Sequence, residues 1–211
     1  PNEFAEDAEK DTVAEATNGT AGSANGQKNT AAQNQELRAE NMNNTAQTSA
    51  PAKEEKIRKT AIIYSPVNGI AADLSTAPDE GFAGKMMGDG YLVRPEEGMA
   101  YAPEDATVSF IFPSKHAVGL TSDDGTEYLL HIGVDTVNLD GKGFETFVKD
   151  GDRVKRGDKL IGFDIKYIQE HAKSDECMVV FTSLQEGEEI RMSKSGKVEK
   201  LEKTAEIVSL N

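Results

Sequence analysis

The sequence predicts an all-β fold: an antiparallel β-sandwich or barrel-like single domain with one short helix, preceded by a disordered linker. Three observations lead to this prediction. The composition changes sharply near residue 60, short apolar runs recur from Ala61 onward, and Gly, Pro, Asp and Asn separate those runs. Strand-length runs at fairly even spacing, with turn residues between them, are typical of sandwiches and barrels.

Residues 1–59 are predicted to be a linker that forms no core. In residues 1–50, the six residue types Ala, Asn, Thr, Gln, Gly and Ser supply 34 of the 50 positions. Such a segment cannot bury enough apolar surface to offset its chain entropy. Because the chain begins with Pro1 rather than Met, we also expect it to be a piece of a longer protein.

Residues 60–211 are predicted to fold as one domain, because about 150 residues suffice for a single core. The expected strands are the eight apolar runs Ala61–Tyr64, Tyr91–Arg94, Thr107–Phe112, Ala117–Thr121, Glu127–Val134, Lys159–Phe163, Met178–Ser183 and Ala205–Leu210. Ile165–Lys173 is expected to form the short helix. Its apolar residues fall at helical spacing, and Asp164 can cap its first turn.

His131 lies within the expected strand Glu127–Val134. Because side chains alternate along a strand, the alternate positions from Tyr128 to Val134 share one face, which is wholly apolar and should face the core. His131 then points outward or into a shallow depression, beside Gly133, which leaves room for a group to approach the imidazole. A strand histidine with no role is the alternative at this point.

A second histidine is expected to lie beside His131. A turn at 122–125 would join the two flanking strands as a hairpin, with position 116 opposite position 131. His116 and His131 would then be cross-strand neighbours, although a register error of one would place them on opposite faces. The third histidine, His171, lies near the end of the expected helix, where the helix dipole favours it.

Charge and cysteine content exclude several classes of partner. The domain carries 27 acidic and 16 basic side chains, a net charge of −11, which disfavours nucleic acid and anionic membranes and favours a basic protein partner. No apolar run approaches the ~20 residues of a membrane helix. The single cysteine, Cys177, precludes an intramolecular disulfide, suits a reducing compartment and is expected to be a buried, inert thiol.

The motifs that are missing also narrow the chemistry. H-x-H and H-E-x-x-H are absent, so two histidines lack the third ligand of a catalytic zinc site. The G-x-S-x-G elbow and the G-x-x-x-x-G-K-[ST] loop are absent as well. A neutral imidazole is a competent nucleophile, and a neighbouring imidazole can donate a hydrogen bond to a phosphoryl group. A histidine phosphoryl carrier that needs no cofactor and no metal is therefore the favoured interpretation.

Several segments resemble one known family. Gly125–Val137, with the sequence GTEYLLHIGVDTV, is similar to the active-site signature of the IIA domains of the bacterial phosphoenolpyruvate-dependent sugar phosphotransferase system, glucose/β-glucoside/sucrose class. Ser114–Ala117 resembles the second histidine segment of that family. Further similarity occurs at Ser65–Gly69, Phe82–Gly90, Gly143–Phe144 and Asp150–Val154.

The resemblance implies a phosphotransferase in sugar uptake. The basic carrier HPr would phosphorylate Nε2 of His131, and the group would pass to a IIB domain. His116 matches the supporting histidine, and Ser114 matches a hydroxyl residue that hydrogen-bonds the active imidazole. Asp135 and Thr136 match the residues that follow the active histidine. The resemblance also implies an apolar docking surface made up of Phe82, Met86, Met87, Phe112, Leu129 and Val137. Because the domain charge of −11 suits a basic donor, Asp79, Glu127 and Asp135 are candidate acids at its rim.

Two other functions remain open. A regulatory IIA-like domain attached to a sugar transporter would be phosphorylated but would not pass the phosphoryl group to a IIB domain. A lipoyl- or biotinyl-carrier module has an entry hairpin similar to Val148–Leu160, but Lys85 lacks the context of its modified lysine. The expected location is the cytoplasm, with residues 1–59 as a tether to a membrane permease.

Overall fold

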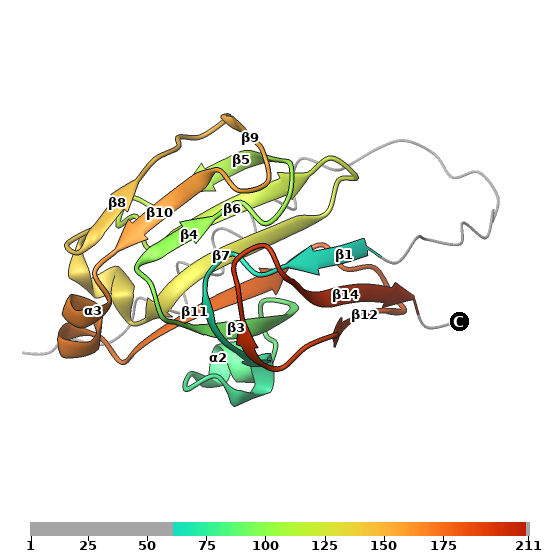
Figure 1. Ribbon diagram of the computed structural model, residues 1–211, viewed down its shortest axis with the longest axis horizontal. Coiled ribbons are helices and arrows are strands. Elements are labelled where there is room, and N and C mark those ends of the chain that lie inside the picture. The colour runs from blue at the N-terminus through green and yellow to red at the C-terminus, as the bar shows by residue number, and fades with distance from the viewer. Residues whose placement is uncertain (1–60, 210–211) are drawn as a thin grey trace, which may run out of the picture. The chain divides into compact units, whose positions relative to one another are not determined.

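Residues 61–209 form three antiparallel sheets in a computed structural model (Figure 1). The predicted linker 1–59 lies outside the described residues. The largest sheet has eight strands, in the order β13 (Gly196–Val198), β2 (Gly69–Asp73), β3 (Asp89–Pro95), β11 (Ser174–Phe181), β7 (Glu127–Val134), β6 (Ala117–Ser122), β5 (Ala106–Ile111) and β9 (Arg153–Val154).

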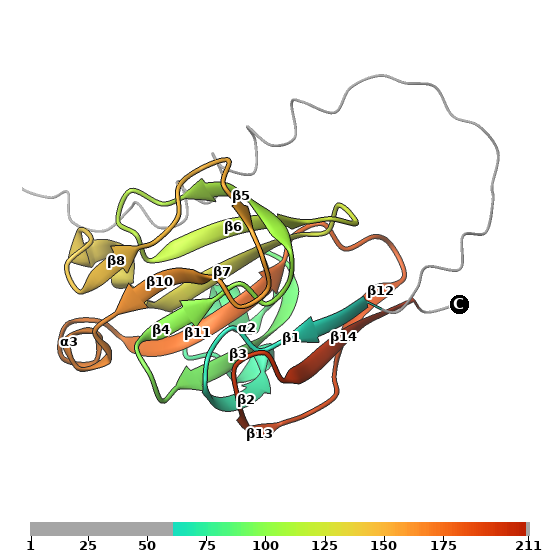
Figure 2. The same cartoon turned by 45° about the horizontal axis from the view of Figure 1, so that its top comes forward.

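Two three-stranded sheets complete the sandwich. The first has the order β4 (Met99–Tyr101), β10 (Lys159–Phe163) and β8 (Phe144–Thr146), and the second has the order β1 (Ala61–Tyr64), β14 (Lys203–Ser209) and β12 (Glu188–Met192). In Figures 1 and 2, the second sheet lies as a separate group to the right of the first. The all-β antiparallel fold predicted from the sequence is confirmed.

One apolar cluster joins all three sheets. It contains Leu130 of the large sheet, Ile161 of β10 and Ala205 of β14, each at most 1% exposed. The core-facing positions of β7 from Tyr128 to Ile132 belong to this cluster, as the strand alternation predicts. Burial of these side chains between sheets supplies the main driving force for folding.

Val134 does not face this core, contrary to the prediction. It belongs to a second, smaller cluster on the opposite face of the large sheet, together with Leu129. The cause is Gly133, whose φ of 73° interrupts the extended backbone and so inverts the alternation for the residue that follows.

The second cluster is covered by two short helical segments. These are η1 (Leu74–Thr76), which supplies Leu74, and α2 (Glu80–Ala83), which supplies Phe82. The same cluster includes Leu92 of β3 and Met178 of β11, and Figure 1 shows α2 beside β3. This outer face, rather than the sandwich interior, carries His131.

All eight predicted strands are present, and three of them agree with the prediction at both ends: β1, β7 and β10. The strands β2, β4, β8, β9, β12 and β13 were not predicted. Most of them span only two or three residues, too few to establish an alternating pattern. Tertiary pairing therefore determines them.

The predicted helix is confirmed as α3 (Ile165–His171), and Asp164 caps it by accepting a hydrogen bond from the Tyr167 amide at 3.0 Å. The structure adds α2 and the 3₁₀ segments η1 and η2 (Thr136–Leu139). Each is too short to reveal helical periodicity. Cys177 is buried as predicted, and burial raises the pKa of its thiol.

Candidate active site

The imidazoles of His116 and His131 lie edge to face, with ring centroids 4.7 Å apart and an interplanar angle of 79°. His131 is in the middle of β7, and His116 immediately precedes β6. The predicted proximity is therefore present, but the predicted register is wrong by one residue, because Ala117 is the residue that pairs with His131.

The rings meet despite this register because His116 lies outside the regular ladder. Its carbonyl still accepts a hydrogen bond from the Ile132 amide at 2.8 Å. Lys115, in the preceding turn, has a left-handed backbone with φ of 59°. Strand alternation does not govern a side chain at such a turn, so the His116 ring can lie on the face that carries His131.

His116 is held in a buried position by its neighbours. It is 3% exposed, its ring lies 5.2 Å from the Phe112 ring, and its Nδ1 lies 2.8 Å from Ser114 Oγ. Ser114 was expected to hydrogen-bond the imidazole of His131, and this expectation is wrong. The hydroxyl is two residues from His116 in the same tight turn, so it reaches that ring instead.

His131 is half-buried, and its Nδ1 is a buried atom. Its ring makes an edge contact with Phe82 at a centroid distance of 5.0 Å. Because Nδ1 faces the protein interior, Nε2 is the nitrogen that remains available to a reactant.

Both imidazoles are neutral at physiological pH. Burial lowers the pKa of His116 to about 4. Burial, assisted by the neighbouring His116, lowers the pKa of His131 to about 3, although the Gly133 backbone opposes this shift. A neutral imidazole keeps a nitrogen lone pair, which a nucleophile requires.

The turn after His131 is built around Gly133 and Thr136. A Cβ atom on Gly133 would lie 2.5 Å from Thr136 Cγ2 and 2.6 Å from the Ser174 carbonyl oxygen. Gly133 was expected to leave space beside the imidazole, but that space is occupied, and the residue meets a backbone requirement instead. Thr136 is fully buried and donates a hydrogen bond from Oγ1 to the Ile132 carbonyl at 2.6 Å.

Thr136 and Asp135 therefore shape the turn rather than touch the rings. Asp135 is exposed and has a left-handed backbone with φ of 62° at the start of η2. Within residues 61–209, neither side chain hydrogen-bonds an imidazole.

The six predicted apolar docking residues, which we call the apolar ring, are Phe82, Met86, Met87, Phe112, Leu129 and Val137. Four of them belong to or pack against the second cluster, while Met86 and Val137 lie outside it. Met86 is 70% exposed. Met178 of β11 is also part of this surface, because it is the residue that pairs with His131 of β7. The sequence analysis did not identify Met178, because no local pattern predicts which residue 47 positions away pairs with His131.

Besides Asp135, the predicted rim acids are Asp79 and Glu127, and these two have different surroundings. Asp79 caps α2 by accepting hydrogen bonds from the amides of Gly81 at 2.9 Å and Phe82 at 3.2 Å. It thereby supports the helix that brings Phe82 to His131. Glu127 is half-buried at the first position of β7, four residues from His131 along the strand.

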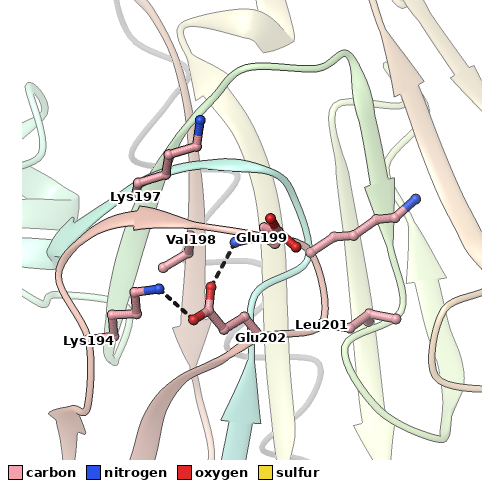
Figure 3. Close-up of a pocket in the computed structure, with 7 residues that line it drawn as sticks. Lys194, Lys197, Val198, Glu199, Leu201 and Glu202 are labelled. Atoms are coloured by element: carbon pink, nitrogen blue, oxygen red, sulfur yellow. Dashed lines mark hydrogen bonds and ion pairs between the residues drawn. The ribbon is translucent and has the colours of Figure 1, made fainter.

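One pocket of the described residues, drawn in Figure 3, is lined by neither histidine. It has a volume of about 660 Å³ and is lined by Lys194, Lys197, Val198, Glu199, Lys200, Leu201 and Glu202. Figure 3 shows the Lys194 ammonium directed at the Glu202 carboxylate, an ion pair of 2.5 Å. The histidine pair instead lies beside apolar side chains of the second cluster, with His116 buried and His131 half-buried.

Residues 61–209 contain no cluster of three or more potential metal ligands among His, Cys, Asp and Glu. In the same part of the chain, no helix has the length and apolarity needed to cross a membrane.

Comparisons with known proteins agree with this geometry. The family model described as "phosphoenolpyruvate-dependent sugar phosphotransferase system, EIIA 1" matches residues 61–187. The chain is 47% identical over 143 residues to the "PTS system glucoside-specific EIICBA component" of Staphylococcus carnosus (strain TM300), an alignment that covers 68% of this chain. The chain spans 20% of that relative's length.

A solved structure also matches. It is the glucose permease IIA from Mycoplasma capricolum, with a TM-score of 0.67 and 35% sequence identity. The match covers 72% of this chain and 99% of that one. The chain therefore belongs to the EIIA 1 family of the phosphoenolpyruvate-dependent sugar phosphotransferase system and is a phosphotransferase component of that type.

Proposed function

We propose that His131 accepts a phosphoryl group on Nε2 from phosphorylated HPr and passes it to a IIB domain, in sugar uptake and phosphorylation. The observation that carries this proposal is the pair of neutral imidazoles in edge contact at 4.7 Å, with Nδ1 of His131 buried. The burial leaves Nε2 as the nitrogen that a phosphoryl donor can reach.

The transfer needs no general base. The Nε2 lone pair of His131 attacks phosphorus in line as the bond from phosphorus to the donor imidazole breaks. Because the imidazole is neutral at the start, Nδ1 keeps its proton and no proton has to leave. The main requirements are position and electrostatic stabilisation, and β7 supplies a rigid support for the ring.

We assign His116 a supporting role. When Ser114 Oγ donates its proton to Nδ1 of His116, Nε2 of His116 carries the ring proton and can donate it in a hydrogen bond to a phosphoryl oxygen. The 2.8 Å distance between Ser114 Oγ and Nδ1 allows this tautomer.

The apolar ring and the net charge favour a protein donor. An apolar surface around a phosphohistidine excludes water from the labile bond and offers a docking patch. The charge of −11 on the domain complements a small basic carrier such as HPr, with Asp79, Glu127 and Asp135 as candidate contacts.

A membrane permease is the proposed setting. The relative from Staphylococcus carnosus is named as an EIICBA component. We infer that the present chain likewise works beside IIB and IIC domains, joined to them by residues 1–59. A tether of that length would keep His131 at high effective concentration near its acceptor.

The test is phosphorylation of the full chain with phosphoenolpyruvate, enzyme I and HPr, followed by mapping of acid-labile phosphate. We expect label on His131, and none in His131→Ala. We expect His116→Ala to accept the group but to fail to pass it to a IIB domain. His171→Ala, which alters an exposed imidazole at the end of α3, is the control and should behave as the parent. Label on another residue would overturn the proposal.

A further inference from the structure

Met86 stands out among the apolar side chains of the described residues. Its side chain is 70% exposed, whereas the three other exposed large apolar residues, Ile62, Ile70 and Phe147, range from 39% to 44%. An apolar side chain that is so exposed contributes little to the stability of the fold, and its thioether sulfur is accessible to reagents in solution. Met86 is also a member of the apolar ring, so a change at its sulfur would alter the proposed docking surface.

The backbone around Met86 is held firmly, so its exposure is a property of the turn. The Met86 amide donates to the Gly81 carbonyl at 3.0 Å. Lys85 has a left-handed backbone with φ of 54°, and its ammonium pairs with Asp89 at 2.6 Å. The same turn continues α2, whose Phe82 contacts the His131 ring. The Met86 sulfur is therefore presented to solvent on the element that borders the reactive histidine.

Other methionines provide internal references. Met178, opposite His131 on β11, is fully buried, and Met87 is half-buried against the second cluster. Oxidation of methionine requires access to sulfur, so the burial order predicts that Met86 reacts before Met87, and Met87 before Met178.

We propose that Met86 is a reversible oxidation site for peroxides and that its sulfoxide slows phosphoryl acceptance by His131. The sulfur lone pair attacks one oxygen of hydrogen peroxide and the O–O bond breaks. The second oxygen leaves as hydroxide and takes up the proton of the first, which gives water and the sulfoxide. The sulfur loses two electrons to the peroxide and becomes a sulfoxide. This conversion places a polar group in the apolar ring, where a docking protein would have to desolvate it.

This inference rests on the proposed function, because the rate it changes is that of phosphoryl transfer. The fold should not change, since the sulfoxide oxygen projects into solvent. The expected effect is about a three- to tenfold lower second-order rate constant for phosphorylation by HPr, as is usual when an exposed apolar contact of an interface is lost.

The experiment treats the full chain with hydrogen peroxide and maps sulfoxides by mass spectrometry. The phosphorylation rate of each protein is then divided by its own rate before treatment. We expect Met86 to oxidise first among the methionines of residues 61–209 and the rate to fall with the same time course. Methionine sulfoxide reductases, one for each sulfoxide epimer, should restore it.

The variants separate Met86 from other targets. In Met86→Leu the ratio of rates after and before peroxide should stay near one. Met86→Gln, which carries a permanent polar group, should lower the phosphorylation rate without peroxide. Met192→Leu, on β12 against the main core, and Met42→Leu, outside the described residues, should lose rate on oxidation as the parent does.

The possible failures are distinguishable. Peroxide inactivation that persists in Met86→Leu, or complete Met86 oxidation with an unchanged rate, would overturn this inference alone. An unoxidised chain that accepts no phosphoryl group would overturn the proposed function and this inference with it.

Discussion

At the residue scale, Glu104 couples the stability of the domain to pH. It lies in the turn between β4 and β5, where burial raises its pKa to about 7, with further contributions from Asp124, Asp123 and Asp105 that outweigh the opposing effect of Tyr128. The folded form thus holds a proton that the unfolded chain releases near pH 4.5. Stability is therefore lost as pH rises from about 4.5 to about 7.

Glu104→Gln should remove this dependence, because glutamine stays uncharged. We expect the variant to be more stable than the parent at pH 8 by about 1 kcal/mol, after allowance for solvent screening of a partly exposed group. At pH 4.5 the two should differ little. Urea unfolding at both pH values measures the difference, and Glu145→Gln, at an exposed site on β8, is the control. An equal gain at both pH values would contradict the assigned cause.

The residues of the site illustrate how far sequence reasoning extends at this scale. His131 and His116 can be singled out because a strand pattern and a short loop predict that they lie close together. The hydrogen-bond partner of Ser114 cannot be predicted in the same way. A shift of one residue in the turn decides which imidazole its short hydroxyl side chain reaches.

At the element scale, the end of β7 depends on one glycine. Gly133 combines a positive φ with two neighbouring atoms, one side-chain and one backbone, that would lie closer than 3 Å to a Cβ atom at this position. Gly151 also has a positive φ, but a Cβ atom there would meet nothing within 4 Å. Alanine substitutions at these two positions therefore distinguish the cost of backbone strain alone from the cost of strain together with steric overlap.

Gly151→Ala should lose about 1 kcal/mol of stability through strain alone. Gly133→Ala should lose about 3 kcal/mol, because the Thr136 methyl group and the Ser174 carbonyl must also move. Chemical denaturation measures both losses. Similar losses in the two variants would show that packing around Gly133 contributes nothing, and steric overlap would then not explain why glycine is needed in the turn.

At the scale of the whole molecule, the division at residue 60 remains a prediction from composition. Its test is limited trypsin digestion, since Lys53, Lys56, Arg58 and Lys59 lie together just before the domain. We expect rapid cleavage there and a resistant fragment that begins near Thr60 and still accepts phosphate on His131.

Slow cleavage before residue 60, or equally fast cleavage within residues 61–209, would contradict the predicted boundary. The fragment should also pass its phosphoryl group to a separate IIB domain at a rate that depends on concentration in the ordinary bimolecular way, because the proposed tether has been removed.

The sequence by itself determined the fold class, eight of the strands, the capped helix α3 and the proximity of His116 and His131. These features depend on local patterns: alternation along a strand, turn residues between strands and a motif of fixed spacing. Only the tertiary structure decided the register of β6 on β7, the face of Val134, the partner of Ser114 and the place of Met178 beneath His131. Each of these depends on contacts between distant segments or on one residue with an unusual backbone angle, and neither leaves a periodic trace in the sequence.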